Sequence, residues 1–245
     1  MQDAPVVAFD ELDSTNAEAR RRAEAGETGP LWIAAARQSA GRGRRGRAWE
    51  TGRGNLAATY LFTTRKPPAE AAQVSFVAAL AVADLARAFV PASLVSLKWP
   101  NDTLIDGRKT AGILVESGQG AGDGLWVAVG IGVNLVASPR AADRPATAFG
   151  DHMRAPPPAP LEALGILAPA FARWRDLWER LGFSPIAQAW TAIAHGLGEP
   201  CSARLASETV DGVAEGLDGD GALRLRTTAG TVRRITAGDV FFGGA

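Results

Sequence analysis

The pattern of the sequence changes at Gly198, and this change constrains the fold more than any other feature. From there to the C-terminus, five short segments alternate apolar and polar residues, and turn formers such as Asp218-Gly219-Asp220-Gly221 separate them. Short alternating runs at regular intervals are typical of a small β-barrel or sandwich. Before Gly198, apolar runs of strand length stand between longer runs with helical spacing. We therefore predict an α+β body over residues 1–197 and a small β-barrel over residues 198–245.

Within the body, capping and turn residues indicate where elements begin and end. Thr15 and Glu18 have the spacing of a capping box, so a helix is expected to begin at Ser14 or Thr15. Asp106-Gly107 is a strong two-residue hairpin turn. We expect strands at 6–9, 31–36, 55–62, 94–99, 104–105, 110–116 and 125–135, and helices at 70–90, 161–181 and 185–195, the last with Ser184 as its cap. A flexible link is expected at 118–124 and a Pro- and Ala-rich loop at 136–160.

The composition excludes several classes of protein. The chain has 245 residues, and 26 Lys and Arg balance 26 Asp and Glu, so its net charge gives no sign of a nucleic-acid partner. The longest apolar stretch, Val74–Val90, is interrupted by Asp84 and Arg87, so we expect no transmembrane helix. The N-terminus lacks the basic-then-apolar order of a signal peptide, and one cysteine excludes an internal disulfide. We therefore expect a cytoplasmic protein.

An arginine- and glycine-rich loop follows the predicted strand at 31–36. Its residues 38–49 read Gln-Ser-Ala-Gly-Arg-Gly-Arg-Arg-Gly-Arg-Ala-Trp. Three glycines match the spacing of the dinucleotide fingerprint G-x-G-x-x-G, but no helical pattern follows, which disfavours that interpretation. Glycines let a ligand approach the backbone, and guanidinium groups bind phosphate or carboxylate, so the loop could bind an anion. A nucleic-acid-binding loop with Trp49 stacked on bases, or a solvated hairpin loop, are the alternatives.

A second cluster of polar residues surrounds the predicted hairpin. The chain has three lysines, and two of them, Lys98 and Lys109, lie here. Lys109 begins the returning strand next to Gly112, where its ammonium group could stabilise negative charge between a carboxylate and a phosphate. Asn101 or Asp102 could help to hold Mg²⁺ on phosphates, because magnesium prefers oxygen ligands; a plain turn with a solvated lysine is the alternative.

Other reaction types lack their motifs. The sequence contains no Gly-x-Ser-x-Gly elbow, no Walker loop and no histidine-rich metal pair, and its two histidines leave little for a metal cage. Cys201 begins an apolar segment and is expected to be a core residue. Any chemistry would therefore use positioned cations and amides, without a covalent intermediate on the enzyme.

Taken together, these motifs resemble those of the biotin–protein ligase family. The matching segments occur in the family's order at 13–16, 38–49, 55–56, 98–102, 109–116 and 130–134. The resemblance implies a class II synthetase-like mixed sheet with helices, followed by an SH3-like barrel. It also implies a two-step reaction in which biotin and Mg·ATP form biotinyl-5′-AMP. A lysine of a biotin carboxyl carrier domain, in acetyl-CoA carboxylase or a related carboxylase, then receives the biotin.

The resemblance further implies roles for individual residues. The expected biotin-binding residues are Ser14, Thr15, Asn16, Gln38, Gly41, Arg42, Gly43, Arg44, Trp49, Lys109 and Gly112. The expected ATP and adenylate residues are Arg44, Lys98, Asn101, Asp102, Lys109 and Asn134, with Asp102 as the magnesium ligand. Lys109 and Arg44 are the expected catalytic residues, because Lys109 would contact carboxylate and α-phosphate and Arg44 would retain the adenylate. From the character of the Pro- and Ala-rich loop, and not from the resemblance, we also expect residues 145–149 to close over the adenine.

Three expectations concern partners and rivals. Only twelve residues precede Asp13, too few for the DNA-binding domain that some family members carry, so we expect no DNA partner. A homodimer through the central sheet is compatible with the sequence. The rival functions are a lipoate– or octanoate–protein ligase of the same fold, whose expected glycine triplet and nearby histidine are missing, and a nucleic-acid-binding module.

Overall fold

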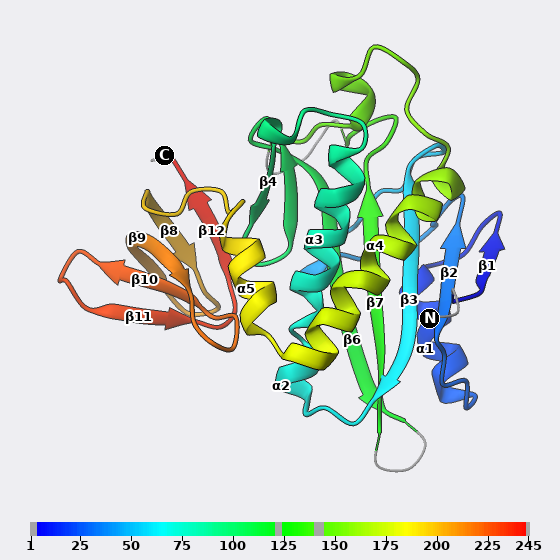
Figure 1. Ribbon diagram of the computed structural model, residues 1–245, viewed down its shortest axis with the longest axis horizontal. Coiled ribbons are helices and arrows are strands. Elements are labelled where there is room, and N and C mark those ends of the chain that lie inside the picture. The colour runs from blue at the N-terminus through cyan, green and yellow to red at the C-terminus, as the bar shows by residue number, and fades with distance from the viewer. Residues whose placement is uncertain (1–3, 121–123, 140–144, 244–245) are drawn as a thin grey trace.

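Two β-sheets lie side by side, with helices packed on the larger one (Figure 1). The computed structural model describes residues 4–120, 124–139 and 145–243, so parts of the predicted link at 118–124 and loop at 136–160 lie outside the described residues. The larger sheet has the order β1-β2-β3-β7-β6-β5-β4. Its strands are β1 (Val6–Phe9), β2 (Leu31–Ala35), β3 (Leu56–Thr64), β4 (Val95–Lys98), β5 (Asp102–Ile105), β6 (Arg108–Gln119) and β7 (Leu125–Val133). β1 pairs with β2 in parallel and the other neighbours are antiparallel, which confirms the predicted mixed sheet.

Helices cover both faces of this sheet because its central strands bury side chains on both sides. The helices are α1 (Thr15–Glu24), α2 (Pro68–Ala71), α3 (Val74–Arg87), α4 (Pro160–Leu181) and α5 (Ser184–Thr191). On one face α3 and α4 pack over alternate residues such as Trp32 and Tyr60, and on the other α1 packs over Ile33 and Leu61. This alternation follows from the period of two in a strand. The sheet is thus the middle layer of the body (Figure 1).

The most apolar helical segment, Pro68–Arg87, is long and apolar enough to cross a membrane by length and composition alone. In the fold it is mostly buried, because α3 packs against the sheet and against both α4 and α5. Its composition is therefore that of a core helix.

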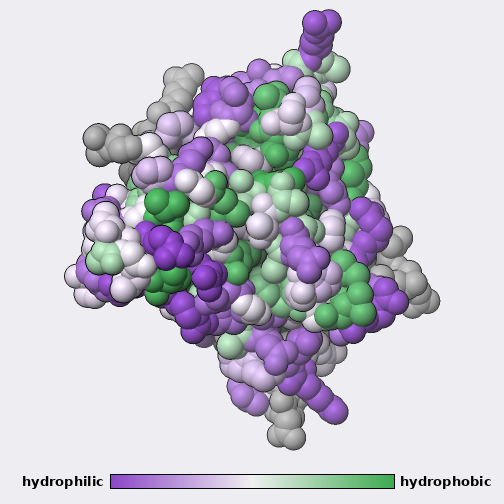
Figure 2. Space-filling model, turned by 60° about the vertical axis from the view of Figure 1, so that its left-hand side comes forward, coloured by the Kyte–Doolittle hydropathy of each residue, from purple (hydrophilic) through white to green (hydrophobic). Residues whose placement is uncertain are grey.

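On the face shown in Figure 2, hydrophobic residues form separate groups among hydrophilic ones. The predicted single helix over 70–90 is wrong in detail, because a turn at Ala72-Gln73 separates α2 from α3.

The C-terminal sheet has five antiparallel strands in the order β11-β10-β9-β8-β12. They are β8 (Pro200–Arg204), β9 (Thr209–Leu217), β10 (Leu223–Thr227), β11 (Val232–Ile235) and β12 (Asp239–Phe242). Among the described residues no pairing joins β11 to β12, so the predicted barrel is wrong in this respect and the sheet is open. Most of β11 is exposed, whereas the start of β12 is buried. The predicted boundary between 197 and 198 lies between α5 and β8 and stays a prediction.

Candidate active site

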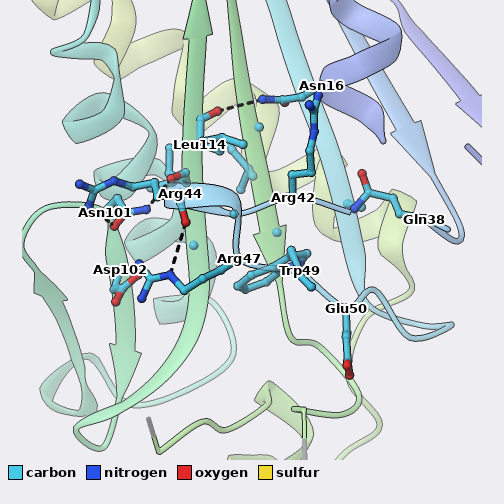
Figure 3. A pocket seen from close by; sticks show the side chains of 18 of the residues that line it. Asn16, Gln38, Arg42, Arg44, Arg47, Trp49, Glu50, Asn101, Asp102 and Leu114 are labelled. Carbon is cyan, nitrogen blue, oxygen red and sulfur yellow. Dashed lines mark hydrogen bonds between the residues drawn. The ribbon is translucent and has the colours of Figure 1, made fainter. Parts of the chain in front are cut away.

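A cavity of about 330 Å³ lies against the larger sheet, at its junction with the arginine-rich loop (Figure 3). Its volume is in the range of small-molecule sites. Of the residues predicted for the site, the cavity is lined by Ser14, Thr15, Asn16, Gln38, Arg42, Gly43, Arg44, Trp49, Asn101, Asp102, Lys109, Gly112 and Asn134. Gly41 and Lys98 lie outside the lining. The structure therefore brings together residues that are more than a hundred positions apart in the sequence.

One end of the cavity is polar because the start of α1 faces it. Ser14, rather than the predicted alternative Thr15, caps the helix: its Oγ accepts from the amide of Ala17 at 3.5 Å. Gln38 Oε1 accepts from the Thr15 amide at 2.8 Å, and Gln38 Nε2 donates to Thr51 Oγ1 at 2.9 Å. These bonds fix the orientation of the Gln38 amide, so this end is preorganised before any ligand arrives.

Asn16 connects this polar end to the sheet. Its Nδ2 donates to the carbonyl oxygen of Leu114 at 3.2 Å, drawn in Figure 3, and to Glu116 Oε2 at 2.8 Å. Its Oδ1 accepts from Thr59 Oγ1 at 2.7 Å. Sequence reasoning missed Glu116 and Thr59, because each lies in an apolar strand whose partner across the fold could not be predicted. Asn16 is therefore held rigidly, with its amide already oriented.

Three glycines on neighbouring strands shape the floor. Gly112 of β6 pairs with Gly132 of β7, and Gly130 lies two residues earlier on β7. A Cβ on Gly132 would overlap the indole of Trp49, and one on Gly112 would lie 3.1 Å from Trp49 Cζ3. The absent side chains thus allow the indole to lie flat on the sheet. A Cβ on Gly130 would clash with the Asn16 side chain, so the two glycines of the Gly-x-Gly pair at 130–132 make room for different side chains.

Gly41 has a structural function. A Cβ there would clash with the carbonyl oxygen of Trp49 and lie 2.9 Å from Gln38 Nε2. The Trp49 amide donates to the Gly41 carbonyl at 2.9 Å. Only glycine permits this close approach, so Gly41 shapes the loop without facing the cavity.

The opposite end of the cavity is cationic. Lys109 Nζ lies 2.5 Å from Asp102 Oδ1 and 5.4 Å from the centre of the Trp49 ring. The second carboxylate oxygen of Asp102 lies 3.7 Å from Lys98 Nζ. Lys98 thus contacts Asp102, whose side chain is 4% exposed, without lining the cavity itself.

The predicted role of Asp102 as a magnesium ligand stays a prediction. Its two oxygens face two ammonium groups, which compete with a cation for the same lone pairs. Among the described residues no group of three or more His, Cys, Asp or Glu side chains could hold a metal. The arrangement lets Asp102 orient Lys109.

Arg44 reaches the cavity from the arginine-rich loop. Its Nη1 donates to Asn101 Oδ1 at 3.2 Å, and the two side chains lie next to each other in Figure 3. Burial lowers the pKa of Arg44, while Asp239 and Asp102 favour its charged form. Arg42, by contrast, is half-exposed and lies 3.9 Å from Glu116.

The predicted adenylate residue Asn134 lies between β7 and the segment 145–147. That segment is paired to β6: Lys109 donates its amide to the Pro145 carbonyl, and Thr147 donates to the Lys109 carbonyl, both at 2.9 Å. Asn134 Nδ2 donates to the Thr147 carbonyl at 3.2 Å, and its buried Oδ1 has no partner among the described residues. An acceptor left unpaired beside a cavity is available to an amino group of a ligand.

Comparison with known proteins places this geometry in a family. The model of the biotin/lipoate A/B protein ligase family matches residues 8–134, and that of the biotin protein ligase C-terminal domain matches residues 196–243. The chain belongs to the biotin/lipoate A/B protein ligase family.

Comparison with individual proteins gives more detail than the family models. The chain is 48% identical to the biotin–[acetyl-CoA-carboxylase] ligase of Paracoccus denitrificans, over 95% of this chain and 98% of that protein. It is 29% identical to the bifunctional ligase/repressor BirA of Bacillus subtilis (strain 168), over 97% of this chain and 74% of that protein. A biotin protein ligase from Aquifex aeolicus, solved in complex with biotin and ATP, has the same fold, with a TM-score of 0.82, 23% identity and coverage of 99% of this chain and 100% of that chain.

Proposed function

We propose that this chain is an ATP-dependent biotin–[biotin carboxyl carrier protein] ligase. The observation that carries the proposal is the polarity of the cavity, which is polar at α1, apolar at the Trp49 indole over the glycine floor and cationic at Lys109 and Arg44. Biotin has the same order of groups: an uncharged ureido ring, an apolar thioether ring and chain, and a carboxylate. A ligand whose polarity matches its site loses few hydrogen bonds on binding.

The polar end also distinguishes biotin from lipoate and octanoate. The amide of Asn16 is buried at this end and that of Gln38 is half-buried. A dithiolane ring or an alkyl end offers the polar groups at this end no hydrogen bond, whereas a ureido ring both donates and accepts hydrogen bonds. We therefore expect the site to prefer the ureido ring.

The first step joins two anions. A carboxylate oxygen of biotin attacks the α-phosphorus of ATP, and the bond from that phosphorus to the bridging oxygen breaks, which releases pyrophosphate and leaves biotinyl-5′-AMP. Lys109 and Arg44 bring fixed positive charge to the point where these anions meet. Preorganised charge of this kind lowers the barrier without any covalent bond to the enzyme. Magnesium arrives with the phosphates of ATP, since Asp102 is engaged by two lysines.

The second step transfers the biotinyl group. The ε-amine of a carrier lysine attacks the acyl carbon, AMP leaves with the electrons of the acyl–phosphate bond, and the amine releases a proton as the amide forms. No cysteine intermediate is needed. Cys201 is buried in the C-terminal sheet, and burial raises its pKa to about 11, so at neutral pH the thiol is not a nucleophile.

The partner class is a biotin carboxyl carrier domain of a biotin-dependent carboxylase. We place the reaction in the cytoplasm, where ATP and such carriers meet. The Asn134 Oδ1 acceptor supports an adenine amino group as its ligand, which favours ATP over nucleotides with a carbonyl at that position. The homodimer and the absence of a DNA partner stay predictions.

The test is a reaction with biotin, Mg·ATP and a biotin carboxyl carrier domain, scored by intact mass. We expect the carrier to gain the mass of one biotinyl group, and a carrier with its target lysine replaced by Arg to gain none. Equal modification with lipoate or octanoate in place of biotin would support the rival ligase. Salt-sensitive oligonucleotide binding without any modification would support the nucleic-acid module.

A further inference from the structure

Residues 41–47 are called the arginine loop. Three of its arginine side chains form hydrogen bonds with the C-terminal sheet or with the residue just before its last strand. Arg45 Nη1 donates to Asp239 Oδ2 at 3.1 Å, and Arg47 Nη2 donates to Asp239 Oδ1 at 3.0 Å. Arg44 Nη2 donates to the carbonyl oxygen of Gly238, just before β12, at 3.3 Å. One carboxylate of β12 therefore holds two guanidinium groups of a loop that lies 192 to 194 positions earlier in the sequence.

Within the loop the Gly43 amide donates to the Arg47 carbonyl at 2.7 Å, and the Asp239 contact adds an anchor from outside the loop. Arg45 has φ of 57° and ψ of 31°, in the left-handed region that residues with a side chain disfavour. The loop contains glycines on both sides of Arg45, and its residues are half-exposed or exposed, so packing inside the loop contributes little to its order. A second bond from Arg45, to the Arg204 carbonyl of β8 at 3.5 Å, adds to the same anchor.

The charges explain why Asp239 suits this role. Its side chain is 10% exposed, so the carboxylate is poorly solvated and depends on the two guanidinium groups for compensation. One carboxylate among the guanidinium groups of Arg44, Arg45 and Arg47 leaves net positive charge at the cavity. Asp239 can thus order the loop and still leave Arg44 charged toward an anionic ligand.

We propose that Asp239 is a positioning residue that keeps the arginine loop closed over the cavity. The proposal deepens the proposed function, because it assigns part of the C-terminal sheet to holding the activated intermediate. Without the carboxylate the loop would populate open states. The apparent affinity for ATP and biotin would then fall in proportion to the fraction of molecules whose loop remains closed. The rate constant of the bound, closed enzyme would change little.

The first test reads the order of the loop by limited trypsin digestion of the full chain without ligands. Trypsin cuts after arginine, and the loop carries four. We expect Asp239→Asn to speed cleavage after Arg44, Arg45 and Arg47 about tenfold or more, as the loss of charge-assisted hydrogen bonds implies. Glu208→Gln is the matched control, because Glu208 also binds arginine through both oxygens, with Arg233 in the C-terminal sheet. An unchanged cleavage map for folded Asp239→Asn, or the same new cuts in Glu208→Gln, would overturn the proposal.

The second test measures the KM for ATP and kcat of the variants. In Asp239→Asn we expect the KM for ATP to rise about tenfold with kcat within about threefold of wild type, and Asp239→Glu to recover most of the loss. A fall in kcat at unchanged KM would overturn the positioning role. If Asp239→Asn does not fold, Arg45→Gln combined with Arg47→Gln breaks the same contact from the exposed side. That variant should be cut faster after Arg42 and Arg44, and protection equal to wild type would overturn the proposal.

The two proposals fail separately. The trypsin experiment requires no biotin chemistry. If the cleavage map is as expected but the chain has no biotin-dependent activity, the proposed function is refuted and the role of Asp239 is still supported. If the chain is an active ligase but its Asp239→Asn variant is cleaved and turns over like wild type, the role of Asp239 is refuted and the proposed function is supported.

Discussion

The replacement Lys109→Met removes one ammonium group from the cavity and keeps most of the side-chain volume. The cost to stability follows from the contacts of Lys109. Its side chain is 28% exposed and pairs with Asp102, which keeps Lys98 as a second cation 3.7 Å away. Loss of a partly exposed ion pair with a remaining partner costs about 1 kcal/mol, so the variant should fold.

The cost to adenylate formation should be much larger. Removal of one preorganised donor at a developing charge slows the chemical step by about 10²- to 10³-fold, or about 2.7–4 kcal/mol of transition-state stabilisation. The assay is biotin-dependent exchange of pyrophosphate into ATP. We expect Lys109→Met to lose exchange by that factor while its thermal unfolding stays close to wild type.

Lys66 gives a closely matched control for this experiment. Its side chain is also 28% exposed, it lies 4.9 Å from the ring centre of Trp178, and it pairs with Glu70 at 3.4 Å. It does not line the cavity. Lys66→Met should therefore lose a similar amount of stability and no exchange activity. Exchange in Lys109→Met within about threefold of Lys66→Met would refute the role that we assign to Lys109.

Three further outcomes follow from the structure. Gly132→Ala places a methyl group against the Trp49 indole and forces it toward the cavity, so the Kd for biotin measured by calorimetry should rise about tenfold or more; an unchanged Kd would show that the floor does not bind the ring. The guanidinium of Arg21 lowers the pKa of Asp13 from 3.8 to about 2, so this pair stabilises the fold above pH 3.8 and loses its effect as the pH falls through 2. Asp13→Asn should thus unfold more easily than wild type at pH 7, and the difference should shrink steadily as the pH falls from 3.8 toward 2; a constant difference across this range would contradict the assignment. Cys201 should react with a thiol reagent at pH 8 only after unfolding, since its raised pKa of about 11 and its burial both suppress the thiolate; rapid labelling of the native chain would count against this.

Several site residues could be predicted because their function depends on short segments of sequence. The arginine loop and the hairpin around Lys109 each place their charged groups within about a dozen residues, and both line one cavity. Capping chemistry was also local, although the cap is Ser14 and the competing Thr15 is the first helical residue. Local rules predict which groups are near a turn or a helix end.

The residues that were missed depend on pairing between distant elements. Asp239 contacts the arginine loop, and Glu116 binds Asn16, and neither carries a signal in its own segment. The open edge of the C-terminal sheet was missed for the same reason, since alternation predicts strands but not which strands pair. Asp102 was assigned to magnesium because a carboxylate after a strand suits an oxygen-preferring cation. That assignment stays a prediction, and the sequence did not predict that Asp102 would lie between Lys98 and Lys109.

The most direct test of the central claim is a crystal structure of this chain with a non-hydrolysable analogue of biotinyl-5′-AMP. We predict that the ureido ring contacts the start of α1 and Gln38, that the thioether ring lies on the glycine floor beside Trp49, and that the phosphate lies within hydrogen-bond distance of Lys109 or Arg44. An analogue bound with the reverse orientation, or at another place on the molecule, would contradict the account.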